Sequence, residues 1–110
     1  MMNICTGDRL RQELDRLSVA LTPLEVVTGV PKWKTSVFLQ GGRLTSDEIT
    51  RIEKALTAID RIQSAIFPAR LDCRDGIALR AAIEALHAGR FGDVERMAVP
   101  PPENPSVITF

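Results

Sequence analysis

The sequence predicts a small all-α fold built around one hydrophobic core. Its 110 residues match the usual size of a single domain, and 45% of them are apolar, which is enough for a compact core. The apolar residues recur mainly at steps of three and four, the spacing of an amphipathic helix. Two capping-box sequences, which begin at Thr22 and Thr45, mark helix starts.

The first helix is expected from about Thr6 to Ala20. Leu10, Leu14 and Leu17 recur at i, i+4 and i+7, and mostly charged or amide side chains lie between them. This pattern predicts one apolar stripe on an otherwise solvated helix.

The second helix is expected to start at a capping box formed by residues 22–25, Thr-Pro-Leu-Glu. The Thr22 hydroxyl would accept a backbone N–H, and the Glu25 side chain would accept the backbone N–H of Thr22 in return. The helix should be short, because Thr28-Gly29 follows and glycine tolerates the left-handed conformation of a tight turn.

A third helix is expected over residues 32–40. Pro31 suits a helix start, and Gly41-Gly42 should end the helix. A short helix, a glycine turn and a second short helix make up the plan of a helix-turn-helix motif.

The longest helix should begin at the second capping box, residues 45–48, and end near Phe67-Pro68, because the residue before a proline is disfavoured in a helix. One stripe of positions alternates in steps of three and four, as in a core-facing helix or a coiled-coil interface. These positions are Ile49, Ile52, Leu56, Ile59, Gln63 and Ile66, and Ala55 and Ile62 widen the stripe.

One more helix is expected to start at Asp72 or Asp75 and to end at Ala88-Gly89. It has an apolar line and several alanines that permit close packing, and beyond Gly92 the order should weaken. Residues 99–110 read as an extended or disordered Pro-rich tail whose apolar end could contact this fold or a partner. The apolar line consists of Leu79, Ile83 and Leu86, and the alanines are Ala78, Ala81, Ala82 and Ala85.

Composition and motifs exclude several classes of function. The formal net charge is zero, with 14 basic and 14 acidic residues, which argues against a polybasic binder. Cys5, Cys73 and a single histidine cannot form a usual zinc site, and no phosphate-binding loop or nucleophile motif occurs. A Cys5–Cys73 disulfide has no support in the sequence. We therefore expect no enzyme, no metal and no cofactor.

The expected location is the cytoplasm. No apolar stretch is long enough to span a membrane, and the N-terminal residues lack the pattern of a signal peptide.

Residues 24–56 carry a set of positions that resembles the Cro/phage-repressor (XRE-type) helix-turn-helix family. The chain departs from the family pattern in three places, where the family prefers a small residue, a capping Ser or Thr, and an aliphatic residue; here these are Glu25, Pro31 and Thr35. The resemblance extends over about the first 60 residues and implies a lambda-repressor-like fold. The matching positions are Leu24, Thr28-Gly29-Val30, Phe38, Gly41, Arg43-Leu44-Thr45, Ile49, Ile52 and Leu56.

The resemblance implies that the chain binds double-stranded DNA, with the third helix in the major groove. Gln40 would pair with adenine, Lys32 with guanine, and Val37 would touch a thymine methyl group. Three further residues, Thr22, Lys34 and Arg43, would contact the DNA backbone. The residues expected on the exposed face of the helix are Lys32, Trp33, Ser36, Val37 and Gln40, with Ser36 a phosphate or water contact.

The charge distribution supports this interpretation independently. Residues 26–46 carry a net charge of +3, whereas residues 1–25 sum to −1 and residues 47–110 to −2. Phosphates favour such a local concentration of cations.

The side chain of Trp33 can be interpreted in two ways. It could be exposed and contact sugars or a base methyl, which we favour, or it could cover the core between the second and fourth helices.

These expectations describe residues 1–67 as a DNA-binding domain, 68–98 as a helical extension for dimerisation, and 99–110 as the tail. The protein would be a phage-type or mobile-element regulator, most often a repressor, that binds a palindromic operator as a homodimer. Two alternatives stay open. One is a protein-binding antitoxin or phage-encoded inhibitor that uses the tail, and the other is a DNA-binding phage assembly protein such as a terminase small subunit.

Overall fold

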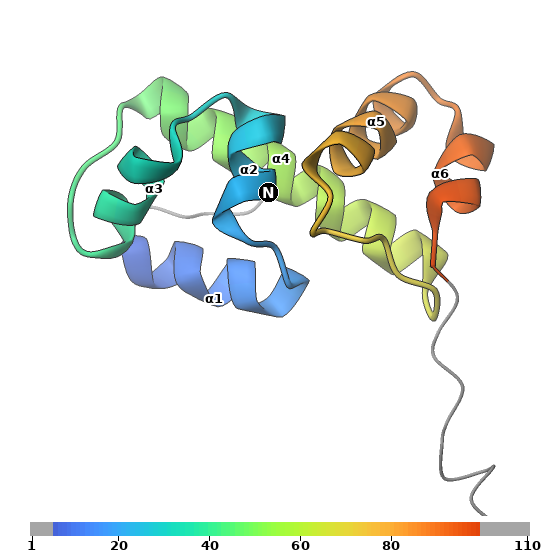
Figure 1. Ribbon diagram of the computed structural model, residues 1–110, viewed down its shortest axis with the longest axis horizontal. Coiled ribbons are helices and arrows are strands. Elements are labelled where there is room, and N and C mark those ends of the chain that lie inside the picture. Colours follow the sequence, from blue (N-terminus) through green and yellow to red (C-terminus); the bar gives the residue numbers. More distant parts are fainter. Residues whose placement is uncertain (1–5, 100–110) are drawn as a thin grey trace, which may run out of the picture.

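The computed structural model describes residues 6–99, and this part of the chain forms six helices. In Figure 1, α4 runs diagonally behind the other helices and extends from one end of the molecule to the other; α1, α2 and α3 lie along its first half and α5 and α6 along its second. Apart from one bridge between Arg70 and Val99, the described residues form no β structure. The all-α prediction is thus confirmed. The six helices are α1 (Gly7–Leu17), α2 (Leu21–Thr28), α3 (Lys32–Leu39), α4 (Ser46–Ile66), α5 (Gly76–His87) and α6 (Phe91–Met97).

Helix α1 buries the predicted leucine stripe and ends earlier than expected. Leu10, Leu14 and Leu17 are all buried. The helix ends at Leu17 rather than Ala20, because Ser18 takes a left-handed conformation (φ 58°) and the N–H of Val19 bonds back to the Leu14 carbonyl.

The capping box predicted for α2 is wrong. The helix begins at Leu21, its N-cap is Ala20, and no side chain caps it. Leu21 packs against the core, and the N–H of Leu24 bonds to the Ala20 carbonyl, so the N-cap lies two residues before the expected Thr22. Thr22 therefore lies inside the helix, where its hydroxyl stays exposed.

The turn between α2 and α3 matches the prediction. Gly29 adopts a left-handed conformation (φ 74°), which a side chain would disfavour. The buried hydroxyl of Thr28 donates to the Leu24 carbonyl at 2.8 Å and accepts the N–H of Val30 at 3.1 Å, so it satisfies two backbone groups inside the protein. Helix α3 then starts directly after Pro31.

Helix α4 starts and ends as predicted. The Thr45 hydroxyl accepts the N–H of Glu48 at 3.1 Å, and the Glu48 carboxylate accepts the N–H of Thr45 at 3.0 Å, which is a complete capping box. The helix ends at Ile66, with Phe67 as its C-cap before Pro68. No helix within the described residues is long and apolar enough to cross a bilayer.

Helix α5 begins at Asp75, the second of the two residues that the sequence offered as its cap. The Asp75 carboxylate accepts the N–H groups of Ile77 and Ala78 at 3.0 and 3.2 Å. Asp72 instead accepts the N–H of Arg74, and this contact lowers the pKa of the Asp72 carboxyl. Small residues, together with Leu79, form the buried face of α5, whereas the larger Ile83 and Leu86 are half-buried.

Helix α6 was not predicted. The sequence analysis expected order to weaken beyond Gly92, and this expectation is wrong, because residues 91–97 form a helix. Its seven residues are too few to display a periodic apolar stripe, and the helix depends on contact with α5. Val94 is fully buried there, and Phe91 packs against the same core. A helix this short is stabilised by tertiary packing rather than by its own sequence.

The apolar side chains in the second half of α4 are covered by the same chain. Ile59, Ile62 and Ile66 are buried within this chain, where α5 packs against α4, so the two elements cover one another. Phe67, the C-cap of α4, is 78% exposed. Cys73 is a buried free thiol whose pKa is raised by desolvation. Cys5 and the tail after Val99 lie outside the described residues.

Candidate nucleic-acid interface

Helix α3 is held to the core by one side and presents the other to solvent. Thr35 and Phe38 are buried, although Thr35 is polar. The residues on the outward side define a surface that we call the α3 face: Lys32, Trp33, Ser36, Val37 and Gln40, of which Ser36 is half-buried and the others are exposed.

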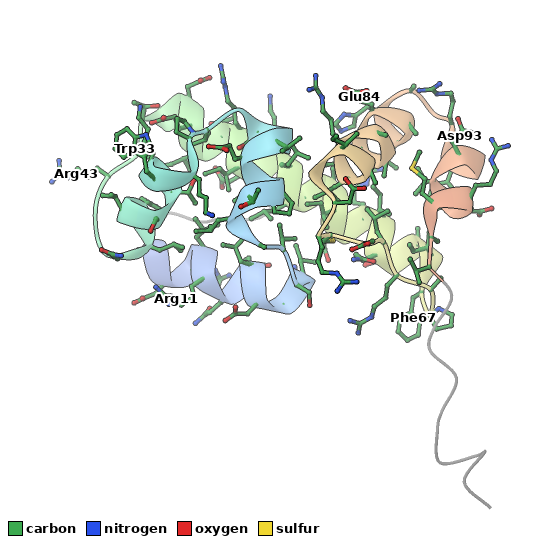
Figure 2. The ribbon with its side chains drawn as sticks, viewed as in Figure 1. Arg11, Trp33, Arg43, Phe67, Glu84 and Asp93 are labelled. Atoms are coloured by element: carbon green, nitrogen blue, oxygen red, sulfur yellow. The ribbon has the colours of Figure 1, made fainter. Side chains whose placement is uncertain are left out.

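Trp33 lies on the outside of the molecule rather than over the core. Its side chain is 66% exposed, and the Nζ of Lys34 lies 5.7 Å from the centre of its ring, within cation–π range. Figure 2 shows Trp33 at the same end of the molecule as Arg43, on the loop between α3 and α4. Of the two readings of Trp33, the structure supports exposure.

Thr22 lies next to the start of α3 although it is ten residues away in sequence. The Nζ of Lys32 donates to the Thr22 hydroxyl at 3.1 Å. Both residues are exposed, so this bond joins the first turn of α2 to the first turn of α3 at the surface of the protein.

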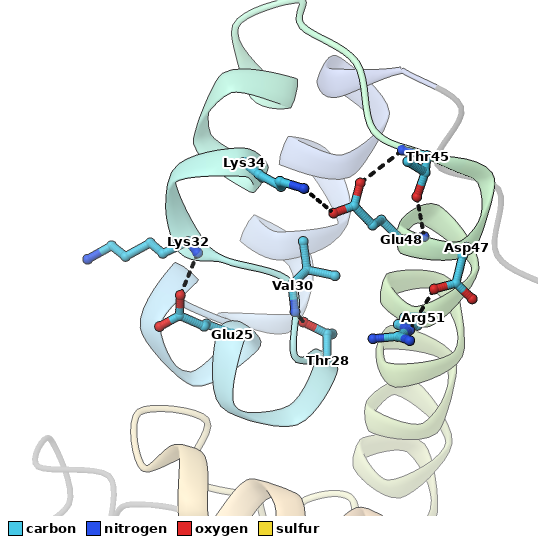
Figure 3. Close-up of polar contacts among 9 residues, drawn as sticks. All are labelled: Glu25, Thr28, Val30, Lys32, Lys34, Thr45, Asp47, Glu48 and Arg51. Atoms are coloured by element: carbon cyan, nitrogen blue, oxygen red, sulfur yellow. Dashed lines mark hydrogen bonds and ion pairs between the residues drawn. The ribbon is translucent and has the colours of Figure 1, made fainter.

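Lys34 is engaged inside the protein. Its Nζ lies 3.2 Å from a carboxylate oxygen of Glu48, on the first turn of α4 (Figure 3). The N–H of Thr45 and then Lys34 itself lower the pKa of the Glu48 carboxyl. An ion pair with a neighbouring helix leaves Lys34 less suited to a phosphate contact than its position in sequence suggests.

Sequence reasoning missed the role of Glu25 in this region. The N–H of Lys32, the first residue of α3, donates to a Glu25 carboxylate oxygen at 2.6 Å (Figure 3). A signal for this contact was present, since Pro31 carries no side-chain acceptor and the first N–H groups of a helix need one from elsewhere.

The net charge around α3 in the folded protein is therefore lower than the +3 obtained by summing residues 26–46. Residues 26–46 contain three cations and no carboxylate, but the fold brings Glu25 and Glu48 into contact with Lys32 and Lys34. For these five side chains, three positive and two negative charges sum to +1, and Arg11 of α1, which donates to the Leu39 carbonyl at 3.5 Å, adds one further cation at the end of α3. The surface is weakly rather than strongly basic, and Arg43 is exposed beside it on the loop after α3 (Figure 2).

A hollow of about 310 Å³ lies between α3 and the loop that follows it. Trp33 and Val37 border it on the helix, and Arg43 and Leu44 border it on the loop. Lys34, Thr45 and Glu48 also line it, so the hollow combines apolar side chains with the Lys34–Glu48 ion pair and the Arg43 cation.

The described residues contain no group of three or more His, Cys, Asp or Glu side chains placed to hold a metal ion. Comparison of the chain with protein-family models, with curated proteins and with solved structures finds no match.

Proposed function

We propose that this protein is a sequence-specific DNA-binding regulator of transcription, in which α2 and α3 act as a helix-turn-helix motif of the lambda-repressor type. The observation that carries the proposal is the arrangement of α3, a short helix after a glycine turn that Thr35 and Phe38 anchor to the core. Its opposite side is exposed to solvent apart from the half-buried Ser36. A helix presented in this way has the shape that the major groove admits.

The residues of the α3 face then divide into two roles. Lys32 and Gln40 reach base edges, as a cation does with guanine and an amide with adenine. Thr22 and Arg43, at the two edges of the surface, contact phosphates and set the position of the helix. Lys34 does not contact DNA in this arrangement. It positions its neighbours through the ion pair with Glu48 and the contact with the Trp33 ring.

We further propose that the protein acts as a homodimer on a palindromic operator, as a cytoplasmic repressor. A single motif of this kind reads few base pairs, and a two-fold dimer places two such helices about 34 Å apart. The surface that supports a dimer is the start of α5, where Ile77 is 78% exposed beside Val26 of α2, also exposed. Gly76 allows α5 to approach α2 closely because it has no side chain. A Cβ at this position would lie 2.8 Å from the Val26 Cβ.

A protein-binding role is the second candidate, and one observation favours it. The α3 face has a net charge near +1 once Glu25 and Glu48 are counted, and Trp33 and Val37 are apolar and exposed. Weak charge and exposed apolar side chains suit a protein partner better than phosphates do. An assembly protein that binds DNA without reading its sequence remains the third candidate.

The test is selection of bound sequences from a random duplex library at roughly physiological salt. The chain is compared with Lys32→Ala/Gln40→Ala and with a control pair of the same residue types, Gln12→Ala/Lys54→Ala, which are exposed on α1 and α4.

We expect a palindromic consensus that the control retains and the α3 variant loses. Enrichment without a consensus would favour the assembly-protein function. A folded protein that enriches no DNA would overturn the proposal and favour a protein partner.

A further inference from the structure

A second hollow, of about 250 Å³, lies along α4 where the end of α5 meets it. One helix supplies all but one of its lining residues, at spacings of three and four that place them on the same face. The exception is His87, the last residue of α5. Small-molecule sites usually measure about 300–1,000 Å³, so a ligand held here must be small. The lining residues on α4 are Thr50, Glu53, Lys54, Thr57, Ala58 and Arg61.

The charged groups around this hollow have no partners within the described part of the protein. The side chains of Lys54, Arg61 and His87 form no hydrogen bond or ion pair with another described residue, and neither does Glu53. Arg51, on the same helix but outside the hollow, pairs instead with Asp47 at 2.9 Å. The charged side chains that α4 contributes are two cations and one carboxylate, so the hollow favours an anion.

Thr57 adds a polar group that is also without a partner. Its Oγ1 is buried, and no described residue forms a hydrogen bond with it. Buried hydroxyls in native proteins are nearly always paired, because an unpaired one costs free energy. A threonine on a helix has two common rotamers, so rotation about its Cα–Cβ bond redirects the hydroxyl without moving the backbone. Thr57 lies one turn before Arg61, and the two side chains can therefore bond to the same anion.

The arrangement along the helix separates the charges. Glu53 and Arg61 are eight residues apart, which is about 12 Å of helix. An anionic group beside Arg61 thus avoids the Glu53 carboxylate. Between them lies Ala58, whose methyl group offers apolar surface to the body of a ligand.

We propose that this hollow binds a small organic carboxylate, with its charged group at Arg61 and Thr57 and its apolar body over Ala58. None of these residues belongs to the α3 face, so the site would bind its ligand whether or not α3 binds DNA. Binding between α4 and the last residue of α5 would also stabilise the contact of the two helices, because a ligand stabilises the state that it binds.

The test is a titration of the isotope-labelled chain with benzoate, followed by the backbone N–H signals in NMR. Benzamide is the matched probe, because it has nearly the same shape and no charge. A ligand of nine non-hydrogen atoms should bind with a dissociation constant of about 1 mM. We expect saturable shifts at Thr57, Ala58 and Arg61. Benzamide should bind about fivefold more weakly, because a guanidinium bonds more strongly to a carboxylate than to a neutral amide.

Variants of α4 connect binding to the hollow. Arg61→Gln should lose the preference for benzoate over benzamide, whereas Arg51→Gln, which removes an exposed arginine outside the hollow, should keep it. Thr57→Val preserves the side-chain shape and removes the unpaired hydroxyl. It should weaken benzoate binding about threefold and leave the protein at least as stable in urea.

Equal affinities for benzoate and benzamide would overturn the proposal, and so would unchanged benzoate binding by Arg61→Gln. Shifts that grow linearly up to about 20 mM benzoate, well above the expected dissociation constant, would show that the hollow is not a site. Full benzoate affinity in Thr57→Val would overturn the role of its hydroxyl. DNA is absent from these measurements, so each of these failures would leave the proposed function standing.

Discussion

Glu25 on α2 accepts a hydrogen bond from the backbone N–H of Lys32, the first residue of α3, at 2.6 Å. Pro31 precedes that helix and has no side-chain acceptor, so a residue of the previous helix does what an N-cap side chain usually does. A carboxylate at a helix N-terminus also complements the helix dipole. The contact holds α2 and α3 together across the glycine turn.

Removal of this acceptor should destabilise the protein. We expect Glu25→Ala to lower the free energy of unfolding by about 1 kcal/mol, the usual loss when an N-cap side chain is removed. Glu25→Gln keeps a carbonyl acceptor on a side chain of the same length and should lose less. Urea unfolding curves give both values, and equal midpoints for all three proteins would show that the bond does not contribute.

The same carboxylate should oppose binding to DNA. If α3 enters the major groove, Glu25→Gln removes a negative charge beside Lys32 and should tighten binding several-fold at low salt, with a smaller gain at high salt because salt screens charges. Glu95→Gln, an exposed carboxylate on α6, is the matched control and should leave affinity unchanged. Weaker binding by Glu25→Gln would contradict a role for α3 at the phosphates.

Gly7 should be required by the contact between α1 and α3. A Cβ there would lie 2.3 Å from the Phe38 carbonyl oxygen and 2.9 Å from the Leu39 Cα, and both are backbone atoms that cannot turn aside. Glycine-to-alanine changes in helices usually stabilise by up to about 1 kcal/mol, but Gly7→Ala should destabilise. Gly92→Ala on α6, where a Cβ meets nothing within 4 Å, is the control and should be neutral or stabilising in thermal unfolding. If both variants gained stability, α1 and α3 would not be in the contact described.

The capping box of α4 should make stability depend on pH. Thr45 and then Lys34 hold the pKa of Glu48 below its ordinary value, so the unfolded chain binds more protons than the folded one. This contribution is present above about pH 4.3, the ordinary value for glutamate, and is lost as the pH falls through the lower folded value. Wild type should exceed Glu48→Gln in stability near neutral pH, and the difference should shrink as the solution is acidified. A difference that stays constant in urea unfolding down to about pH 3 would exclude this linkage.

Self-association should depend on the start of α5. Ile77→Glu and Phe67→Glu replace two equally exposed apolar side chains, each at 78%, on separate surfaces. Each should change the stability of a single chain by no more than about 0.5 kcal/mol, as usual for surface positions. Only Ile77→Glu should abolish the dimer in light scattering at tens of micromolar. A wild-type monomer would refute the dimer, and dissociation by Phe67→Glu alone would move the interface to the end of α4.

The two capping-box sequences show what a short sequence pattern can and cannot predict. Both match the pattern of Thr followed three residues later by Glu, yet only Thr45 and Glu48 form the reciprocal bonds. At the other one, Leu21 packs against the core and shifts the helix start, and Glu25 turns to Lys32 instead. The pattern is the same, and long-range packing decides which of its hydrogen bonds form.

The candidate site likewise has features that could be predicted from the sequence and features that could not. The outward positions of α3 were predicted from the family resemblance, and they lie opposite the buried Thr35 and Phe38. The engagement of Lys34 by Glu48 and of Lys32 by Thr22 was not, since fourteen and ten residues separate these partners in sequence. Spacing along one helix gives no information about a neighbouring one.

The sequence by itself determined the order of the first five helices, the leucine stripe of α1, the glycine turn at Gly29 and the limits of α4, because each depends on interactions among residues a few positions apart. Only the tertiary structure decided that α6 forms, that α5 covers the second half of α4, and that Glu25 and Glu48 reduce the charge beside α3. These features depend on contacts between separate helices, and which side chains meet there is determined by packing of the whole core.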